Sequence, residues 1–169
     1  MKHVGCAAIA VLACSVMTVN AADNPDASFY KKAAEGGMAE VQLGTLAQNK
    51  SPTASVKAFG GMMVMDHTAA NDKLKTIAAN KGVKLPTSPS VAQMATKAKL
   101  EVVSGTAFDK SYIKGMVEDH QEDIKEFQNE ATAGQDPDAK AYAAATLPTL
   151  QTHLKKIREI AAAQGLDVK

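Results

Sequence analysis

Two histidines end the same short pattern, Met-Val-x-Asp-His, which runs from Met63 to His67 and again from Met116 to His120. An aromatic residue lies about two helical turns before each histidine, so ring and imidazole share one helix face. A third histidine, His153, follows near the C-terminus. Imidazole nitrogens, supported by carboxylate oxygens, are typical ligands of zinc, copper and iron. The three histidines are therefore candidate ligands of one transition-metal ion.

Four carboxylates are placed to support such a site. Glu40 falls in the apolar stripe of the first predicted helix, and Asp123 lies one turn beyond His120, so either could complete the ligand set. Asp66 and Asp119 each precede a histidine by one residue and lie about 100° around the helix from it. We expect these two aspartates to reach a histidine on a neighbouring helix and to fix its orientation.

Two methionines could add a sulfur ligand. Met63 and Met116 stand one turn before His67 and His120, on the same helix faces. A thioether beside an imidazole favours copper, which makes both methionines candidate soft ligands. The competing interpretation is that they fill the core, as methionines at helical spacing usually do.

The histidines themselves allow other interpretations. Three buried imidazoles can form a polar network that fixes the register of the helices and binds nothing. They could also respond to pH, because such histidines can become charged when their surroundings acidify. The sequence leaves these alternatives open.

Helical sequence surrounds all of these residues. Apolar residues recur at helical spacing, and four prolines each follow a residue of N-cap type, at Pro25, Pro52, Pro89 and Pro137. We predict helices at about 26–49, 52–81, 89–103, 106–133 and 137–164. The glycine pairs Gly36-Gly37 and Gly60-Gly61 interrupt the first two and indicate close helix approach. Short connections favour an all-α, antiparallel four-helix bundle with one additional short helix.

Such a bundle brings the candidate ligands to one level. His67, His120 and His153 each fall near the middle of a long predicted helix, and Glu40 lies beyond the middle of the first. Core-facing residues at the middle of antiparallel helices meet at one depth, where helical bundles build metal sites.

The N-terminal segment is typical of a secretory signal peptide. Lys2 is followed by an apolar run, and small residues precede an expected cleavage after Ala21. We therefore assign residues 1–21 to a signal peptide and 22–169 to a single domain that is periplasmic or secreted. A rival interpretation makes Cys14 the lipidated cysteine of a lipoprotein, but the apolar run before it is very short for that purpose.

Composition argues against several function classes. Both cysteines lie in the signal segment, so we expect no thiolate site in the mature chain. A formal net charge of +1 without a basic block argues against nucleic acid as a partner, and no later stretch is apolar enough to span a membrane. The chain lacks a Gly-x-Ser-x-Gly elbow and a phosphate-binding glycine loop, and we do not expect an enzyme.

Several segments resemble the bacterial exported family called domain of unknown function 4142. They are Phe29 to Glu40, the two Met-Val-x-Asp-His segments and Leu147 to His153. The resemblance covers about residues 26–163 and implies a ferritin-like bundle in the cell envelope. It implies no reaction, because the family has no settled activity. The Glu-x-x-His motif of di-iron bundles is absent, so ferritin's iron chemistry does not transfer to these positions.

The leading hypothesis is an exported, ferritin-like bundle that binds zinc, copper or iron and acts as an envelope or stress accessory protein. The alternative is a non-enzymatic scaffold or interaction module for an envelope protein, in which the histidines form a structural network. The oligomeric state is left open.

Overall fold

The computed structural model describes residues 24–168, and five helices make up the regular structure of this part of the chain. They are α1 (Ala27–Lys50), α2 (Ala54–Asn80), α3 (Val91–Glu101), α4 (Gly105–Ala133) and α5 (Pro137–Ala163). The predicted helices are confirmed, with ends that agree to within about two residues. The predicted signal peptide lies outside the described residues.

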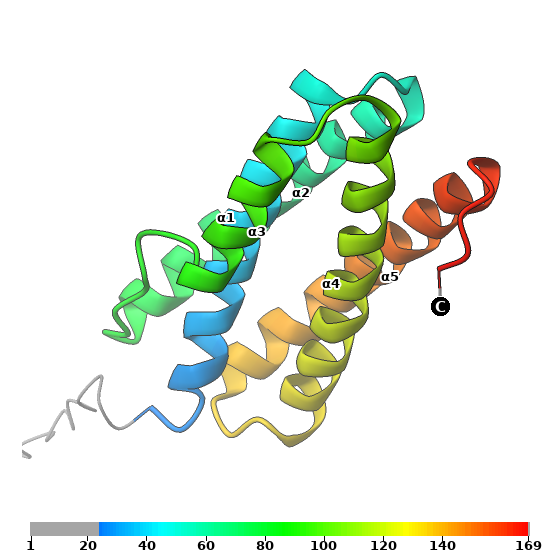
Figure 1. Ribbon diagram of the computed structural model, residues 1–169. Helices are drawn as coiled ribbons and strands as arrows, with labels where there is room; N and C mark the ends of the chain where they lie inside the picture. The colour runs from blue at the N-terminus through cyan, green and yellow to red at the C-terminus, as the bar shows by residue number, and fades with distance from the viewer. Residues whose placement is uncertain (1–23, 169) are drawn as a thin grey trace, which may run out of the picture.

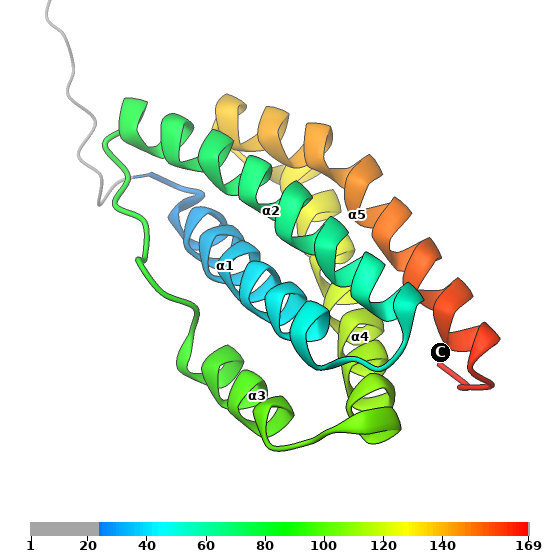
Figure 2. The same cartoon turned by 90° about the horizontal axis from the view of Figure 1, so that it is seen from above.

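Two antiparallel helix pairs, α1 with α2 and α4 with α5, form the bundle (Figure 1). Helices α2 and α5 lie side by side, whereas α3 lies along the outer side of α1 and leads into α4 (Figure 2). This is the four-helix bundle with an additional short helix that the sequence predicts. None of the described helices combines the length and the apolar composition that crossing a membrane requires.

The helix starts are only partly as predicted. Asp136 caps α5, and its side chain accepts a hydrogen bond from the backbone amide of Asp138. The other three prolines precede their helices, whose N-cap residues are Asp26, Thr53 and Ser90. Ser51 lies before the N-cap residue of α2: its hydroxyl donates to the carboxylate of Asp109 on α4, and its oxygen accepts a hydrogen bond from the backbone amide of Thr53.

Glycines let α1 and α2 touch backbone to backbone. A Cβ atom on Gly44 would lie 2.6 Å from the carbonyl oxygen of Gly60, and one on Gly60 would lie 2.6 Å from the carbonyl oxygen of Gly44. A Cβ atom on Gly37 would overlap the side chain of Asn71, only 2.0 Å from its Oδ1. Close helix approach is therefore confirmed at Gly37 and Gly60, and a Cβ atom on Gly61 would also lie only 2.8 Å from Nε2 of Gln48 on α1.

A polar layer separates two apolar clusters of the core. One cluster includes Phe59, Met63, Tyr112, Met116 and Ile157. The other includes Phe29, Leu74, Phe127, Tyr142 and Leu150. Glu40, His67, His120 and His153 fall between the clusters along α1, α2, α4 and α5, and all four are buried. Mid-helix polar residues thus share one depth in the bundle.

A group of carboxylates closes the end of the bundle where α1 begins and α4 ends. Asp26 accepts hydrogen bonds from the backbone amides of Gln135 and Asp136, and Asp136 pairs with Lys81. Glu130 is buried nearby, and its Oε1 has no hydrogen-bond partner among the described residues. Burial, together with the charge of Asp26, raises the pKa of Glu130 to about 7. This carboxyl group is therefore most favourable in the fold when it is protonated.

Replacing Glu130 with glutamine should make stability less dependent on pH. The pKa of Glu130 is about 7 in the folded state against 4.5 ordinarily, so its stabilising contribution is complete below pH 4.5 and is lost as pH rises through 7. The free energy of unfolding of the wild type, relative to Glu130→Gln, should fall by about 1 to 3 kcal/mol between pH 4.5 and pH 8. Urea unfolding of both metal-free proteins measures this difference, and parallel pH profiles would contradict it.

Candidate metal centre

Three imidazoles converge between α2, α4 and α5. One ring nitrogen from each of His67, His120 and His153 lies within 4.8 Å of the other two. The side chains are buried, and His120 is 0% exposed. Nitrogens bound to one tetrahedral zinc ion are about 3.4 Å apart, so small side-chain rotations would bring the three to ligand distance.

The tautomer of His120 follows from its backbone partner. Nδ1 lies 2.9 Å from the carbonyl oxygen of Met116. A carbonyl oxygen can only accept a hydrogen bond, so Nδ1 carries the proton and Nε2 carries a lone pair. This Nε2 faces Nδ1 of His153 at 3.3 Å. Burial, together with His153, lowers the pKa of His120 to about 4, so the ring is neutral at pH 7.

The tautomer of His153 follows in the same way from its hydrogen bond with Asp66. Oδ2 of Asp66 lies 2.9 Å from Nε2 of His153. A carboxylate accepts this hydrogen bond, so Nε2 carries the proton and Nδ1 of the neutral ring carries a lone pair. Burial lowers the pKa of His153, although Asp66 acts in the opposite direction. Two lone pairs on neutral rings therefore face each other across 3.3 Å, an arrangement that a cation would relieve.

His67 adds a third neutral ring. Its Nε2 is buried and has no hydrogen-bond partner within the described part of the chain. Burial, followed by the electrostatic influence of the nearby His120 and His153, lowers the pKa of His67 to about 3. A buried polar group without a partner costs about 1 to 3 kcal/mol, which a bound ligand would offset.

Glu40 lies behind His120 and not among the converging nitrogens. Its Oε1 is 3.8 Å from Nδ1 of His120, on the opposite edge of the ring from Nε2. Its Oε2 is buried without a hydrogen-bond partner that the described residues provide. Burial, followed by the charges of Asp123 and Asp119, raises the pKa of Glu40 well above its ordinary value.

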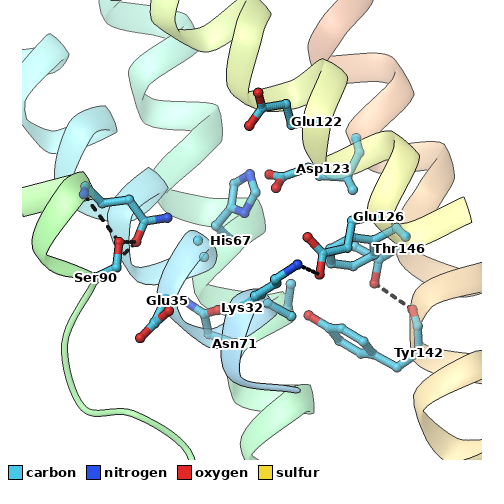
Figure 3. Close-up of a pocket in the computed structure, with 17 residues that line it drawn as sticks. Lys32, Glu35, His67, Asn71, Ser90, Glu122, Asp123, Glu126, Tyr142 and Thr146 are labelled. Carbon is cyan, nitrogen blue, oxygen red and sulfur yellow. Dashed lines mark hydrogen bonds and ion pairs between the residues drawn. The ribbon is translucent and has the colours of Figure 1, made fainter. Parts of the chain in front are cut away.

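Asp123 and Asp119 border two neighbouring cavities. Asp123 and His67 line a cavity of about 240 Å³, and Figure 3 shows the carboxylate of Asp123 facing the imidazole. Asp119 and Glu40 line a second cavity of about 250 Å³. Burial and nearby carboxylates raise the pKa of Asp123 to about 7 and that of Asp119 to about 6. Among the described residues, the group of mutually close ligand atoms consists of the three histidines.

The first cavity has an acidic wall that the sequence analysis missed. Glu35 from α1 and the exposed Glu122 from α4 line it (Figure 3). Gln93 of α3 also lines this cavity. Glu126 also lines the wall and pairs with Lys32 at 3.1 Å. These residues follow no ligand spacing, so only the packing of α1, α3 and α4 brings them together. Negative charge around a concave surface raises the local concentration of cations.

The candidate soft ligands are part of the core. Met63 and Met116 are buried in one apolar cluster with Phe59. Met116 contacts the histidines through its carbonyl oxygen, which accepts from His120. Sulfur ligation by either methionine stays a prediction.

Comparisons with known proteins support the fold and the family. Residues 13–160 match the family described as a domain of unknown function, DUF4142. Among solved structures, a DUF305 protein from Streptomyces coelicolor, described as a candidate secreted protein, is 13% identical with a TM-score of 0.73, over 88% of this chain and 98% of that chain. A DUF305 fragment from Deinococcus radiodurans is 13% identical with a TM-score of 0.70, over 82% and 95% of the two chains. No curated protein matches the chain.

The two solved structures indicate the fold alone, because their sequence identity is low. That fold is a helical bundle of the ferritin-like type, as the sequence predicts. The family match spans most of the chain. The chain belongs to the family described as domain of unknown function DUF4142.

Proposed function

We propose that this protein binds one transition-metal ion through neutral nitrogens of His67, His120 and His153. The observation that carries the proposal is the 3.3 Å approach of Nε2 of His120 to Nδ1 of His153, both assigned as unprotonated. Imidazole ligands suit zinc, copper and iron, so the bound ion belongs to this class. Three imidazoles leave a fourth position, which water or Asp123 would fill.

Asp66 is a positioning residue in this proposal. Its hydrogen bond to Nε2 of His153 holds the proton on that nitrogen and leaves Nδ1 for the metal. We assign the protein to a metal-binding accessory role outside the cytoplasm. The expected signal peptide supports this location, and so does the description of the Streptomyces coelicolor neighbour.

Metal analysis tests the proposal directly. The purified protein is loaded separately with zinc, copper and iron, dialysed, and analysed for bound metal. We expect one ion per chain in the wild type for at least one metal and a large loss in His67→Ala. Sub-stoichiometric metal in the wild type with all three metals would overturn the proposal.

Replacing Asp66 with alanine should weaken metal binding without removing a ligand. Outer partners of metal-bound histidines typically contribute a factor of about 10 to 100 in affinity, so we expect a loss in this range. Asp72→Ala is the matched control, because Asp72 is on the same helix and its side chain is 66% exposed. Competition with a chromophoric chelator measures both affinities. Equal affinities in the two variants would exclude the positioning role of Asp66.

One observation favours a structural network as the second candidate function. Asp66, His153, His120 and the carbonyl of Met116 form a continuous hydrogen-bonded chain if His153 carries two protons. In that case the protein would be an envelope scaffold whose stability is indifferent to chelators. Nitrogen-15 NMR of the metal-free protein at pH 7 distinguishes the structural network from the metal site. The network requires that His153 is charged, whereas the metal proposal requires that it is neutral.

A further inference from the structure

A second cavity is lined by Glu40, whose Oε1 lies 3.8 Å from Nδ1 of His120. It has a volume of about 250 Å³ and is enclosed by α1, α3 and α4. Four of its lining residues are acidic, namely Glu40, Asp119, Glu122 and Asp123. No lysine or arginine is among the described residues that line it. The cavity therefore gathers four carboxyl groups with no basic side chain of the described residues among its lining.

Glu40 supplies an observation that is independent of this acidic composition. It is 3% exposed, and its Oε2 has no hydrogen-bond partner among residues 24–168. Its Oε1 lies 3.8 Å from Nδ1 of His120. Burying a carboxyl oxygen without a partner is unfavourable by several kcal/mol. Because Glu40 lines the cavity, a ligand bound there would supply the partner that Oε2 lacks.

The carboxylates come from two helices, and their oxygens would have to move closer together to share one ion, because the mutually close ligand atoms among the described residues are those of the three histidines. Asp119 and Asp123 are four residues apart on α4 and so share one face of that helix. Glu40 approaches from α1. Carboxylate oxygens without imidazole or sulfur are the ligands of hard cations such as Ca²⁺ and Mn²⁺, and the volume leaves space for bound water.

We propose that this cavity is a second metal site, in which Glu40 and Asp119, with Asp123 at the border, bind a hard divalent cation. His120 separates it from the three-histidine centre, because Nε2 faces His153 while the Nδ1 edge faces Glu40. His67 and His153 do not line this cavity. Asp123 lines both cavities, but Glu40 and Asp119 line only the second, so the second site does not rest on the three-histidine centre.

Manganese binding tests the second site. Mn²⁺ is titrated into the purified, metal-free protein, and the free ion is measured by its electron paramagnetic resonance signal. We expect one Mn²⁺ per wild-type chain and an affinity at least tenfold lower in Glu40→Gln and in Asp119→Asn. Glu118→Gln is the matched control, because Glu118 is exposed on the same helix. Circular dichroism checks that Glu40→Gln and Asp119→Asn are folded. If one of them does not fold, the affinity of the other still tests the site.

The same titration with His153→Ala distinguishes the two proposed sites. Retained Mn²⁺ affinity in this variant supports a separate site, whatever happens to transition-metal binding. Loss of affinity in His153→Ala, with none in Glu40→Gln or Asp119→Asn, would place the ion at the histidines and overturn the second site. No stoichiometric Mn²⁺ binding, or equal affinities in Glu118→Gln and the two cavity variants, would overturn it as well.

Discussion

Replacing His120 with alanine is expected to eliminate the thermal stabilisation that the metal provides. His120 is fixed within the core, because its Nδ1 is anchored to the backbone carbonyl of Met116. A metal that binds the folded state at about 100 times its Kd stabilises it by about 2.7 kcal/mol. For a chain of this size that corresponds to a rise in melting temperature of about 5 to 10 °C. The wild type should show this rise and His120→Ala should not.

A control separates loss of the site from loss of stability. Leu74 is buried in an apolar cluster of the core, so Leu74→Ala should lower the free energy of unfolding by about 2 to 5 kcal/mol. Its melting temperature should still rise when metal is added. Thermal unfolding followed by circular dichroism, with metal and with chelator, measures all three proteins. A rise in His120→Ala as large as in the wild type would contradict the role of His120.

Replacing Gly60 with valine is expected to be among the most destabilising single changes in the bundle. The new Cβ would lie 2.6 Å from the carbonyl oxygen of Gly44 and 3.0 Å from the Cβ of Ala47. The carbonyl is part of the α1 backbone, so α1 and α2 must separate to accommodate the side chain. Overpacking costs about 1 to 3 kcal/mol when side chains can adjust, and we expect the upper end or more here. His67 lies two turns further along α2, so the variant should also bind metal less tightly.

Gly115 provides the matched control for this change. It lies within α4, and a Cβ atom there would have no neighbour within 4 Å. Gly115→Ala should therefore stabilise the protein by about 0.5 to 1 kcal/mol, because alanine favours the helix without a clash. Urea unfolding gives the free energies of both variants. A Gly60→Val protein as stable as the wild type would show that α1 and α2 do not need their close approach.

The convergence of the histidines could be predicted because helices are regular. Counting from the expected helix starts puts His67, His120 and His153 at similar depths, and the structure brings their nitrogens within 4.8 Å. The contact between Asp66 and His153 follows the same logic, since a residue adjacent to a core position points toward the next helix. Their roles as ligand and positioning residues stay proposals.

Other features depend on how whole helices rotate and pack, which local patterns do not specify. Glu40 lies behind His120 because of the rotation of α1, and the sequence placed it only on the core-facing stripe. Helix α2 begins at Ala54 and not at the expected Pro52, and Ser51 hydrogen-bonds to Asp109 on α4, a contact between segments distant in the sequence. The acidic cavities could not be predicted, because they depend on the position of α3, which contributes Gln93 to both.

X-ray absorption spectroscopy of the zinc-loaded protein tests the central claim most directly. Three neutral imidazoles on one ion should appear as a shell of nitrogen scatterers at about 2.0 to 2.1 Å, with the outer-ring scattering of three histidines. The same spectrum should be lost in His120→Ala. A shell of oxygen scatterers with one imidazole or none in the wild type would contradict the three-histidine centre.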